Sequence, residues 1–552
     1  MKLVIVGGVA GGAGVAARAR RLTEDAEIVM FERGEFISFA NCGLPYHVGN
    51  VIPERSSLLV MRPPRFKALT NIDIRISQEV TKINRDKKTV TVRNLRTGES
   101  YEEAYEKLVL ATGSSPVIPP IPGADDPDVM TLWTIPDMDR IRSRVDEGAE
   151  NAVVVGGGFI GLEIAENLQE RGLNVTLVEM LPQVLPPLDP EMAQPLSETL
   201  KTHGIDLRLR RKVTAIHRKE SFEKVAPRVE VELDDGTRLP SDLVVMSVGV
   251  RPNSELAHDA GLETGERGGV KVDEHLRTSD PDIYAVGDVD EVTDIVRGEP
   301  TQIPLAGPAN RQARIAADCM FGRDSVYRGT LGTSVVKVFD LTAASTGASE
   351  KTLKKDGVAY QKIYIHPANH ASYYPGASTL SLKLLFNPKG AILGAQCIGK
   401  EGVDKRIDVI ATAILGGMTV DDLENLELAY APPYGSAKDP VNFAGMVAAN
   451  VLRGDTDPVH ADALPENALL LDVREQSEYD AGHLDDSLLI PVGEVRNRLD
   501  ELPRDREIMV YCGIGLRGYL AERMLKQAGF KAGNLSGGLV TYNMFRDAGL
   551  LS

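Results

Sequence analysis

The sequence predicts an α/β protein of several domains, and three observations support this prediction. Its 552 residues exceed what a single hydrophobic core supports. Two glycine-rich turns, at residues 7–12 and 156–161, each follow an apolar run and open a helix-like segment. Another strand-like run ends at Cys512, far along the chain from both turns. We therefore expect two Rossmann-like domains and a separate α/β domain at the carboxy-terminal end.

The composition is that of a soluble globular protein and excludes several classes of function. Hydrophobic residues make up 43% and charged residues 26%, and no run is long enough to cross a membrane. The net charge of −17 argues against a nucleic-acid partner, because no basic face is apparent. The apolar run at the start is shorter than a signal peptide needs, so we expect a strand there. Four scattered cysteines form no disulfide framework, and this favours the cytoplasm.

The first glycine-rich turn lies between a predicted strand at 3–6 and a helix that runs past Arg21. Val9 stands where the G-x-G-x-x-G pattern has its middle glycine, so this turn alone is weak support for dinucleotide binding. A second strand at 27–31 ends at Glu32, whose carboxylate would accept hydrogen bonds from a ribose. The residues predicted to bind the first dinucleotide are Gly7, Gly8, Ala10, Gly11, Gly12, Glu32 and Arg33.

The second glycine-rich turn fits the G-x-G-x-x-G pattern fully and lies between a predicted strand and a helix. The following strand at 175–178 ends at Glu179, which would bind the 2′-hydroxyl of NAD and repel the 2′-phosphate of NADP. Two dinucleotide sites in one chain indicate electron transfer between two bound dinucleotides. The residues predicted to bind the second dinucleotide are Gly156, Gly158, Phe159, Ile160, Gly161 and Glu179.

Four later segments, at 108–116, 243–253, 278–288 and 305–311, complete a known pattern. With the two turns, they make residues 1–450 resemble the flavoprotein pyridine nucleotide-disulfide oxidoreductases. The resemblance implies FAD in the first site, NADH in the second, and a homodimer formed through an α+β interface domain. It also implies that Asp288 holds the ribityl chain of the flavin. Further cofactor contacts implied by the resemblance are Ala111, Thr112, Gly113, Gly249, Gly287 and Ala306.

The segment 38–46 contains Cys42, the candidate redox cysteine. One branch of the family pairs two cysteines as C-x-x-x-x-C, but here His47 occupies the second position. A lone cysteine must cycle through a sulfenic acid or a mixed disulfide with a small thiol. The resemblance then leaves NADH peroxidase, NADH oxidase and coenzyme A-disulfide reductase. Ala10 stands where peroxidases and many oxidases have a histidine, and this argues against peroxide chemistry.

Two tyrosines favour coenzyme A as part of the substrate. Tyr373 and Tyr430 lie in segments that resemble those by which coenzyme A-disulfide reductases reach the partner subunit's cysteine. Ordinary packing at a subunit interface is the alternative role for both. The residues predicted to bind coenzyme A are Arg18, Arg20, Arg21, Ser38, Asn41, Cys42 and Arg62, where the arginines would hold phosphates. For any one of these arginines a solvated surface charge is the better interpretation, whereas together they form a plausible phosphate-binding set.

After a Gly/Asp/Pro linker, the end of the chain resembles a single rhodanese domain. The supporting segments are 469–474, 478–484, 490–491 and 535–538, together with the loop that begins at Cys512. Backbone N–H groups and a helix N-terminus would stabilise a thiolate or persulfide at Cys512, and Arg517 would add charge. The expected domains are an FAD-binding domain (1–115 and 246–325), an NAD-binding domain (116–245), a dimerisation domain (326–450), a linker (451–461) and a rhodanese domain (462–552).

These features predict an FAD-dependent enzyme that uses NADH to reduce the sulfur–sulfur bond of coenzyme A persulfide, polysulfide or coenzyme A disulfide. Cys42, helped by Ser38, Asn41, Tyr373 and Tyr430, would carry the reduction, and Cys512 with Arg517 would transfer sulfane sulfur. An NADH oxidase and a non-catalytic sulfur carrier or redox sensor are the alternatives. No metal site is expected, because the histidines have no metal-ligand spacing.

Overall fold

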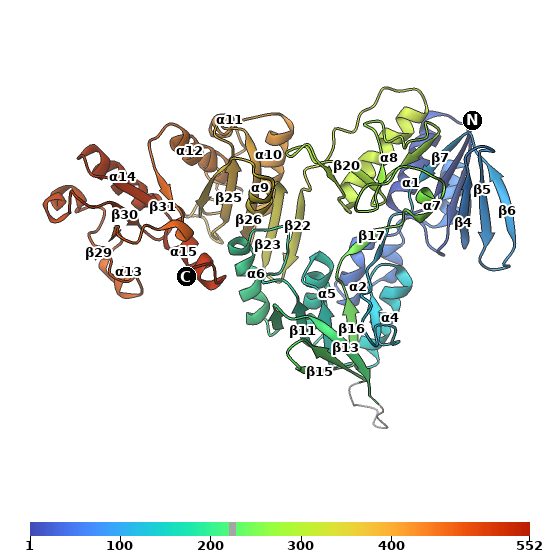
Figure 1. Ribbon diagram of the computed structural model, residues 1–552, viewed down its shortest axis with the longest axis horizontal. Coiled ribbons are helices and arrows are strands. Elements are labelled where there is room, and N and C mark those ends of the chain that lie inside the picture. The colour runs from blue at the N-terminus through green and yellow to red at the C-terminus, as the bar shows by residue number, and fades with distance from the viewer. Residues whose placement is uncertain (220–227, 552) are drawn as a thin grey trace. The chain divides into compact units, whose positions relative to one another are not determined.

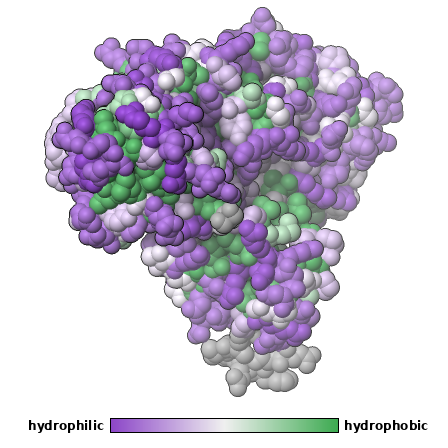
Figure 2. Space-filling view, turned by 60° about the vertical axis from the view of Figure 1, so that its left-hand side comes forward, coloured by the Kyte–Doolittle hydropathy of each residue, from purple (hydrophilic) through white to green (hydrophobic). Residues whose placement is uncertain are grey.

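The computed structural model describes residues 1–219 and 228–551 (Figure 1). Its contacts divide the chain into two units, which we describe separately: Met1–Met180 with Gly204–Thr330, and Leu181–His203 with Leu331–Ser552. The face shown in Figure 2 is largely hydrophilic and carries several hydrophobic areas. No helix within the described ranges combines the length and apolar character that a membrane span requires.

The first unit begins with a parallel five-stranded sheet in the order β19-β7-β1-β2-β3. Its strands are β1 (Lys2–Val6), β2 (Glu27–Glu32), β3 (Asp73–Ile76), β7 (Lys107–Leu110) and β19 (Ile283–Ala285). The central strands β1, β2 and β7 are apolar and buried except at their ends, as expected for strands covered on both faces. The glycine-rich turn joins β1 to α1 (Ala10–Leu22), which packs against α8 (Ala306–Met320). The predicted strand, turn and helix are confirmed.

A second parallel sheet of the same unit has the order β12-β11-β10-β16-β9. Its strands are β9 (Val129–Thr131), β10 (Asn151–Val155), β11 (Asn174–Glu179), β12 (Asp206–Leu209) and β16 (Leu243–Met246). Its second glycine-rich turn opens α5 (Phe159–Glu170), again as predicted. Two antiparallel sheets accompany the parallel ones: β4 (Gln78–Asn84), β5 (Thr89–Asn94) and β6 (Ser100–Ala104), and β13 (Val213–Arg218), β14 (Val229–Leu233) and β15 (Arg238–Ser241).

The second unit contains an antiparallel sheet in the order β22-β23-β26-β25-β24. Its strands are β22 (Ser334–Val338), β23 (Leu341–Gly347), β24 (Gln361–Ile365), β25 (Ser381–Phe386) and β26 (Ile392–Gly399). Strand β26 is buried along its whole length because helices cover the sheet. The helices of this part are α6 (Pro190–Thr202), α9 (Glu350–Asp356), α10 (Val403–Leu415), α11 (Val420–Asn425) and α12 (Pro440–Leu452).

The carboxy-terminal part forms a parallel sheet in the order β27-β31-β30-β28-β29 around a core of its own. Its strands are β27 (Pro458–Val459), β28 (Leu469–Asp472), β29 (Leu488–Leu489), β30 (Ile508–Tyr511) and β31 (Ala532–Leu535). Its α-helices are α13 (Gln476–Asp480), α14 (Leu516–Gln527) and α15 (Gly538–Asp547). Strand β27 falls within the segment predicted as a linker. Its sequence carries no strand pattern, and it is a strand because its backbone pairs with β31.

Candidate active site

The first glycine-rich turn packs tightly against the backbone at the end of strand β7. Gly7 has a φ of +103°, and a methyl group on it would lie 2.1 Å from the carbonyl oxygen of Ala111. The carboxylate of Glu32 accepts hydrogen bonds from the backbone N–H groups of Gly8 at 2.8 Å and Gly34 at 2.7 Å. These contacts hold the acid beside the turn, where a ribose hydroxyl could reach it.

Asp288 follows β19, so it lies at the same carboxyl edge of the parallel sheet as Glu32, and it accepts a hydrogen bond from the Ser114 hydroxyl at 2.8 Å. Burial raises the pKa of Asp288 and, more strongly, that of the neighbouring Asp290. Among the described residues, the buried Oδ2 atom of Asp290 has no hydrogen-bond partner. The glycine turn, the carboxylate of Glu32 and this acidic pair fit a large dinucleotide such as FAD, whose hydroxyl groups would satisfy such acceptors.

The second glycine-rich turn repeats the first. A methyl group on Gly156 would lie 2.4 Å from the carbonyl oxygen of Ser247, whereas one on Gly158 would meet nothing within 4 Å. The turn is therefore tightly packed at Gly156, and there is open space beside Gly158. The buried carboxylate of Glu179 accepts a hydrogen bond from the Gly157 N–H at 2.6 Å. Phe159 and Ile160 form the first turn of α5, so the helix N-terminus faces the mouth of the turn.

The other predicted cofactor residues lie on turns of the same unit. Gly113, Gly249 and Gly287 have φ angles of +65°, +110° and +82°, which only glycine adopts without strain. The Thr112 hydroxyl donates to the carbonyl oxygen of Asn253 at 2.7 Å, so that residue positions the turn. Ala10 and Ala306 begin α1 and α8, and Arg33 is exposed.

Cys42 lies in a short 3-10 helix (Asn41–Gly43) that leads into α2 (Leu44–Val48). The Ser38 N–H donates to the Gly8 carbonyl oxygen at 2.9 Å, which ties this segment to the first turn. Helix α2 packs against α5, the helix of the second turn. The cysteine therefore lies on a segment anchored to both glycine-rich units.

Sequence reasoning missed Glu163, a half-buried residue of α5 close to Cys42. Its carboxylate accepts a hydrogen bond from the Tyr46 hydroxyl at 3.1 Å. Burial raises the pKa of Glu163 to about 7, and Glu166 contributes to the shift. The signal lay in the sequence, since Glu163 follows the last glycine of the second turn by two positions and thus faces the mouth of the site.

The thiol of Cys42 is not activated by the protein alone. The residue is exposed, yet the protein packed around its sulfur raises the pKa of the thiol, and the carboxylates of Glu163 and Asp288 add to this effect. A bound electron-poor ring or a cation would have to favour the thiolate.

The arginines predicted for coenzyme A separate into two groups. Arg20 is buried, and its guanidinium donates to the carbonyl oxygens of Thr70, Glu24 and Ala26 at 2.7, 2.6 and 2.9 Å. This arrangement argues against the predicted role of Arg20, because the guanidinium serves the backbone. Arg18 is held by Asp318 at 2.6 Å. Arg21 and Arg62 are exposed.

The hydroxyl groups of Tyr373 and Tyr430 lie 3.0 Å apart in the second unit, and both residues are exposed. The segments that carry them are joined by a hydrogen bond from the Ala371 N–H to the Gly435 carbonyl oxygen. The buried Arg406 donates to the carbonyl oxygen of Asn369 at 2.8 Å. It also binds the Asp439 carboxylate at 2.9 Å and thus braces both segments.

Cys512 is 1% exposed and lies between strand β30 and helix α14. The Gly515 N–H donates to its sulfur at 3.2 Å. Arg517 lies beside the loop, and Glu478 binds its guanidinium through two contacts of 2.6 Å each. The Gly515 N–H therefore donates to the sulfur, while Glu478 offsets the charge that Arg517 was predicted to add.

Comparison with known proteins agrees with this geometry. The pyridine nucleotide-disulphide oxidoreductase family matches residues 1–313, its dimerisation domain 333–439, and a rhodanese-like domain 458–544. The coenzyme A disulfide reductase of Staphylococcus haemolyticus is 37% identical over 453 residues, which cover 82% of this chain and 100% of that protein.

Two solved structures resemble almost the whole chain. Reduced Bacillus anthracis CoADR-RHD is 49% identical, with a TM-score of 0.95 and 98% of each chain covered. A NAD-dependent persulfide reductase from A. fulgidus is 40% identical, with a TM-score of 0.92, and the match covers 98% of this chain and 100% of that one. The chain therefore belongs to the pyridine nucleotide-disulphide oxidoreductases, in the coenzyme A disulfide reductase branch that carries a C-terminal rhodanese-like domain.

Proposed function

We propose that the protein uses NADH to reduce the sulfur–sulfur bond of coenzyme A disulfide, coenzyme A persulfide or polysulfide. The observation that carries this proposal is the placement of Cys42, on a segment bonded to the first glycine turn and packed on the helix of the second. The relatives described above, a coenzyme A disulfide reductase and a persulfide reductase, support it. Ala10 gives no acid–base group for peroxide or oxygen chemistry, so an oxidase is not favoured.

Cys42 is the proposed nucleophile. Its thiolate attacks one sulfur of R–S–S–R, forms the mixed disulfide Cys42–S–S–R and releases R–S⁻. Two-electron reduction of the mixed disulfide returns the Cys42 thiolate and releases the second R–S⁻. With a persulfide substrate, R–S–SH, the released group is hydrosulfide. No second cysteine is described near Cys42, in line with a mixed disulfide rather than an internal one.

We propose that the first turn, Glu32 and Asp288 hold FAD, and that the second turn and Glu179 hold NADH. Bound FAD would accept a hydride from NADH and supply the electron pair that the cysteine chemistry requires. Glu179 would accept a hydrogen bond from the adenosine ribose and select against the 2′-phosphate of NADPH. Glu163 lies where it can hold or release a proton near Cys42, since its pKa is close to neutral.

We propose that Cys512 carries sulfane sulfur. The Gly515 N–H and the N-terminus of the 12-residue helix α14 would stabilise a negatively charged sulfur there. In this step the Cys512 thiolate takes the outer sulfur of a donor R–S–SH, forms a Cys512 persulfide and releases R–S⁻.

We further propose a homodimer in which Tyr373 and Tyr430 reach the partner subunit's active site, as their exposure allows. Arg21 and Arg62, with Ser38 and Asn41, are the proposed contacts for coenzyme A, and Arg18 could join them only by leaving Asp318. The predicted domain boundaries and a cytoplasmic location remain proposals, and no nucleic-acid or membrane partner is proposed.

The test is NADH oxidation by the FAD-replete protein with coenzyme A disulfide and with coenzyme A persulfide. Cys42→Ser should abolish both activities but retain bound FAD that NADH still bleaches. Cys319→Ser, which alters a buried cysteine of α8, is the matched control and should keep both. Undiminished turnover of Cys42→Ser would overturn the proposal, and NADH oxidation that needs only oxygen would favour the oxidase.

A further inference from the structure

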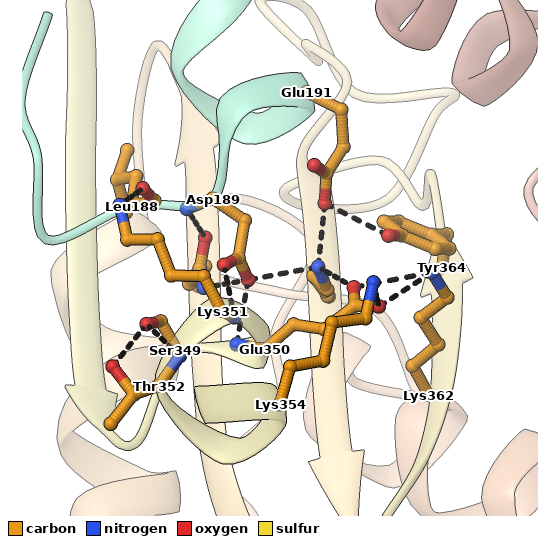
Figure 3. A network of polar contacts seen from close by, with 12 residues as sticks. Leu188, Asp189, Glu191, Ser349, Glu350, Lys351, Thr352, Lys354, Lys362 and Tyr364 are labelled. Atoms are coloured by element: carbon orange, nitrogen blue, oxygen red, sulfur yellow. Dashed lines mark hydrogen bonds and ion pairs between the residues drawn. The ribbon is translucent and has the colours of Figure 1, made fainter. Parts of the chain in front are cut away.

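A buried ion cluster lies on one face of the antiparallel sheet of the second unit, around Lys383 of strand β25 (Figure 3). The ammonium group of Lys383 is fully buried and contacts the carboxylates of Asp189 at 2.8 Å, Glu191 at 2.6 Å and Glu350 at 2.6 Å. Oxygen atoms of these three carboxylates lie within 4.8 Å of one another, as metal ligands could. Lys362 and Lys354 also bind the Glu350 carboxylate, at 2.9 and 2.8 Å, so three lysines balance the three carboxylates.

Tyr364 connects this cluster to the carboxy-terminal part of the chain. Its hydroxyl donates to Glu191 at 2.8 Å, and both residues are buried. Its backbone N–H donates to the Ser536 hydroxyl at 3.3 Å, and its ring meets that of Phe545 edge to face. Two residues after Tyr364, at the end of strand β24, His366 shares a 2.7 Å hydrogen bond with the Thr541 hydroxyl.

Thr541 lies in the first turn of α15, and the backbone of this turn also binds the Cys512 loop. The Leu539 N–H donates to the carbonyl oxygen of Cys512 at 2.8 Å, and the Val540 N–H to that of Gly513 at 3.0 Å. Helix α15 therefore contacts His366, directly after strand β24 of the antiparallel sheet, through the side chain of Thr541. It contacts the Cys512 loop through its own backbone.

Gly537, just before α15, shows how closely the two surfaces fit. A methyl group placed on it would lie 2.9 Å from the Cβ atom of Tyr364 and 2.0 Å from the Thr541 hydroxyl oxygen. The sheet that contains β24 and the carboxy-terminal part of the chain therefore share a closely packed, polar and buried contact. They are joined by this contact as well as by the linker.

We propose that the rhodanese domain works from this docked position, and that Thr541, Ser536 and Gly537 are positioning residues for sulfur transfer from Cys512. The inference rests on the proposed function of Cys512. Docking fixes the first turn of α15 and with it the backbone of the Cys512 loop. The step that depends on it is transfer of the outer sulfur of the Cys512 persulfide to an acceptor thiolate, which gives R–S–SH and the Cys512 thiolate.

The experiment compares two NADH-linked reactions of the full-length, FAD-replete protein. Inorganic polysulfide is the probe for the path through Cys512, and coenzyme A disulfide is the probe for the path that needs Cys42 alone. Thr541→Val, which removes the hydroxyl at similar volume, should lower the polysulfide rate at least fivefold and leave the disulfide rate within twofold. Thr541→Ser, which keeps the hydroxyl, should restore the polysulfide rate.

A pair of glycine variants separates loss of docking from strain in the backbone. Gly537→Ala and Gly549→Ala impose similar strain, since the φ angles are +70° and +68°, but only the first collides with neighbours. Gly537→Ala should lower the polysulfide rate and increase hydrogen exchange in residues 361–366, whereas Gly549→Ala should do neither.

Polysulfide rates of Thr541→Val and Gly537→Ala within twofold of the wild type would overturn the docking proposal alone. A polysulfide rate of Cys512→Ser equal to the wild-type rate would overturn the sulfur-transfer role of Cys512, and this proposal with it.

Discussion

The hydroxyl groups of Tyr373 and Tyr430 share a hydrogen bond of 3.0 Å across 57 positions of sequence. Both tyrosines are exposed, so the bond depends on the segments that carry them and not on burial. Arg406 holds those segments together from the core through Asn369 and Asp439.

This pairing predicts that the two tyrosines act as one unit toward the substrate. Tyr373→Phe or Tyr430→Phe should each raise the KM for coenzyme A disulfide roughly fivefold, because a hydrogen bond of this kind contributes about 1 kcal/mol. The double variant should be little worse than either single one. Steady-state kinetics of all three variants will test this, and Tyr434→Phe, another exposed tyrosine, is the control. Fully additive effects would show that the tyrosines act independently.

Glu179 predicts a preference for NADH over NADPH. Its buried carboxylate, held by the Gly157 N–H, would lie near a 2′-phosphate and repel it. Glu179→Gln should keep NADH activity and reduce the discrimination between the two coenzymes roughly tenfold. The ratio of the two kcat/KM values measures the effect. A wild-type preference for NADPH would contradict the assignment.

The raised pKa of the Cys42 thiol predicts slow alkylation in the FAD-free protein. At pH 7.5, above the pKa of Glu163, iodoacetamide should label Cys42 more slowly than a free cysteine, because burial and the Glu163 and Asp288 carboxylates disfavour the thiolate. Glu163→Gln removes one of these charges and should raise the labelling rate a few-fold. Peptide mass spectrometry follows Cys42 separately from the other three cysteines. An unchanged rate in Glu163→Gln would show that its charge does not reach the sulfur.

Two buried histidines predict loss of stability in mild acid. Burial lowers the pKa of His366, which faces the hydroxyls of Ser381 and Thr541, to about 4. Burial also lowers that of His460, which faces Lys362, Asp462, Glu350 and Lys383, to about 3. The unfolded chain takes up these protons near pH 6.5 and the folded chain does not, so stability should fall as the pH drops from about 6.5 to 4.

For His366 the full effect should be about 3 kcal/mol. Thermal unfolding between pH 7 and pH 4.5 will measure it, and His366→Gln, which cannot take up a proton there, should flatten part of the slope. An identical slope in the variant would place the effect elsewhere.

We expect removal of the Lys383 ammonium group to lower the free energy of unfolding strongly and to leave the chemistry at Cys42 unchanged. Lys383→Met removes the cation that contacts the buried carboxylates of Asp189 and Glu191, while Glu350 keeps Lys362, and this should cost roughly 3–5 kcal/mol. Lys389→Met, an exposed lysine on the turn between β25 and β26, is the matched control and should change little. A Tm unchanged in Lys383→Met would mean that the carboxylates take up protons and stay buried.

Sequence patterns predicted most of the framework because its signals are local. The turns at Gly7 and Gly156 and the acids Glu32 and Glu179 stand at fixed distances from strands that apolar runs reveal. Arg20 shows the limit of such reasoning: a surface-type residue in a helix became a buried brace because the carbonyl groups of Thr70 and Asn71, far along the chain, needed donors.

Contacts between distant segments escaped prediction for the same reason. The pKa of Glu163 is raised by burial and by Glu166, against the hydrogen bond from Tyr46, and this environment forms only in the folded chain. Lys383 lies in an apolar strand, and a single sequence does not show that Asp189 and Glu350 will meet it there. Strand β27 has two residues and exists only because β31 pairs with it.

The close packing at Gly537 limits which rhodanese domains could replace this one, in evolution or in an engineered fusion. A free-standing rhodanese domain grafted in place of this one would need a glycine at that position, hydroxyls at 536 and 541, and an aromatic ring near Tyr364. Exchange of the carboxy-terminal part is therefore constrained by its inner face as much as by its cysteine, and engineered fusions should carry over both.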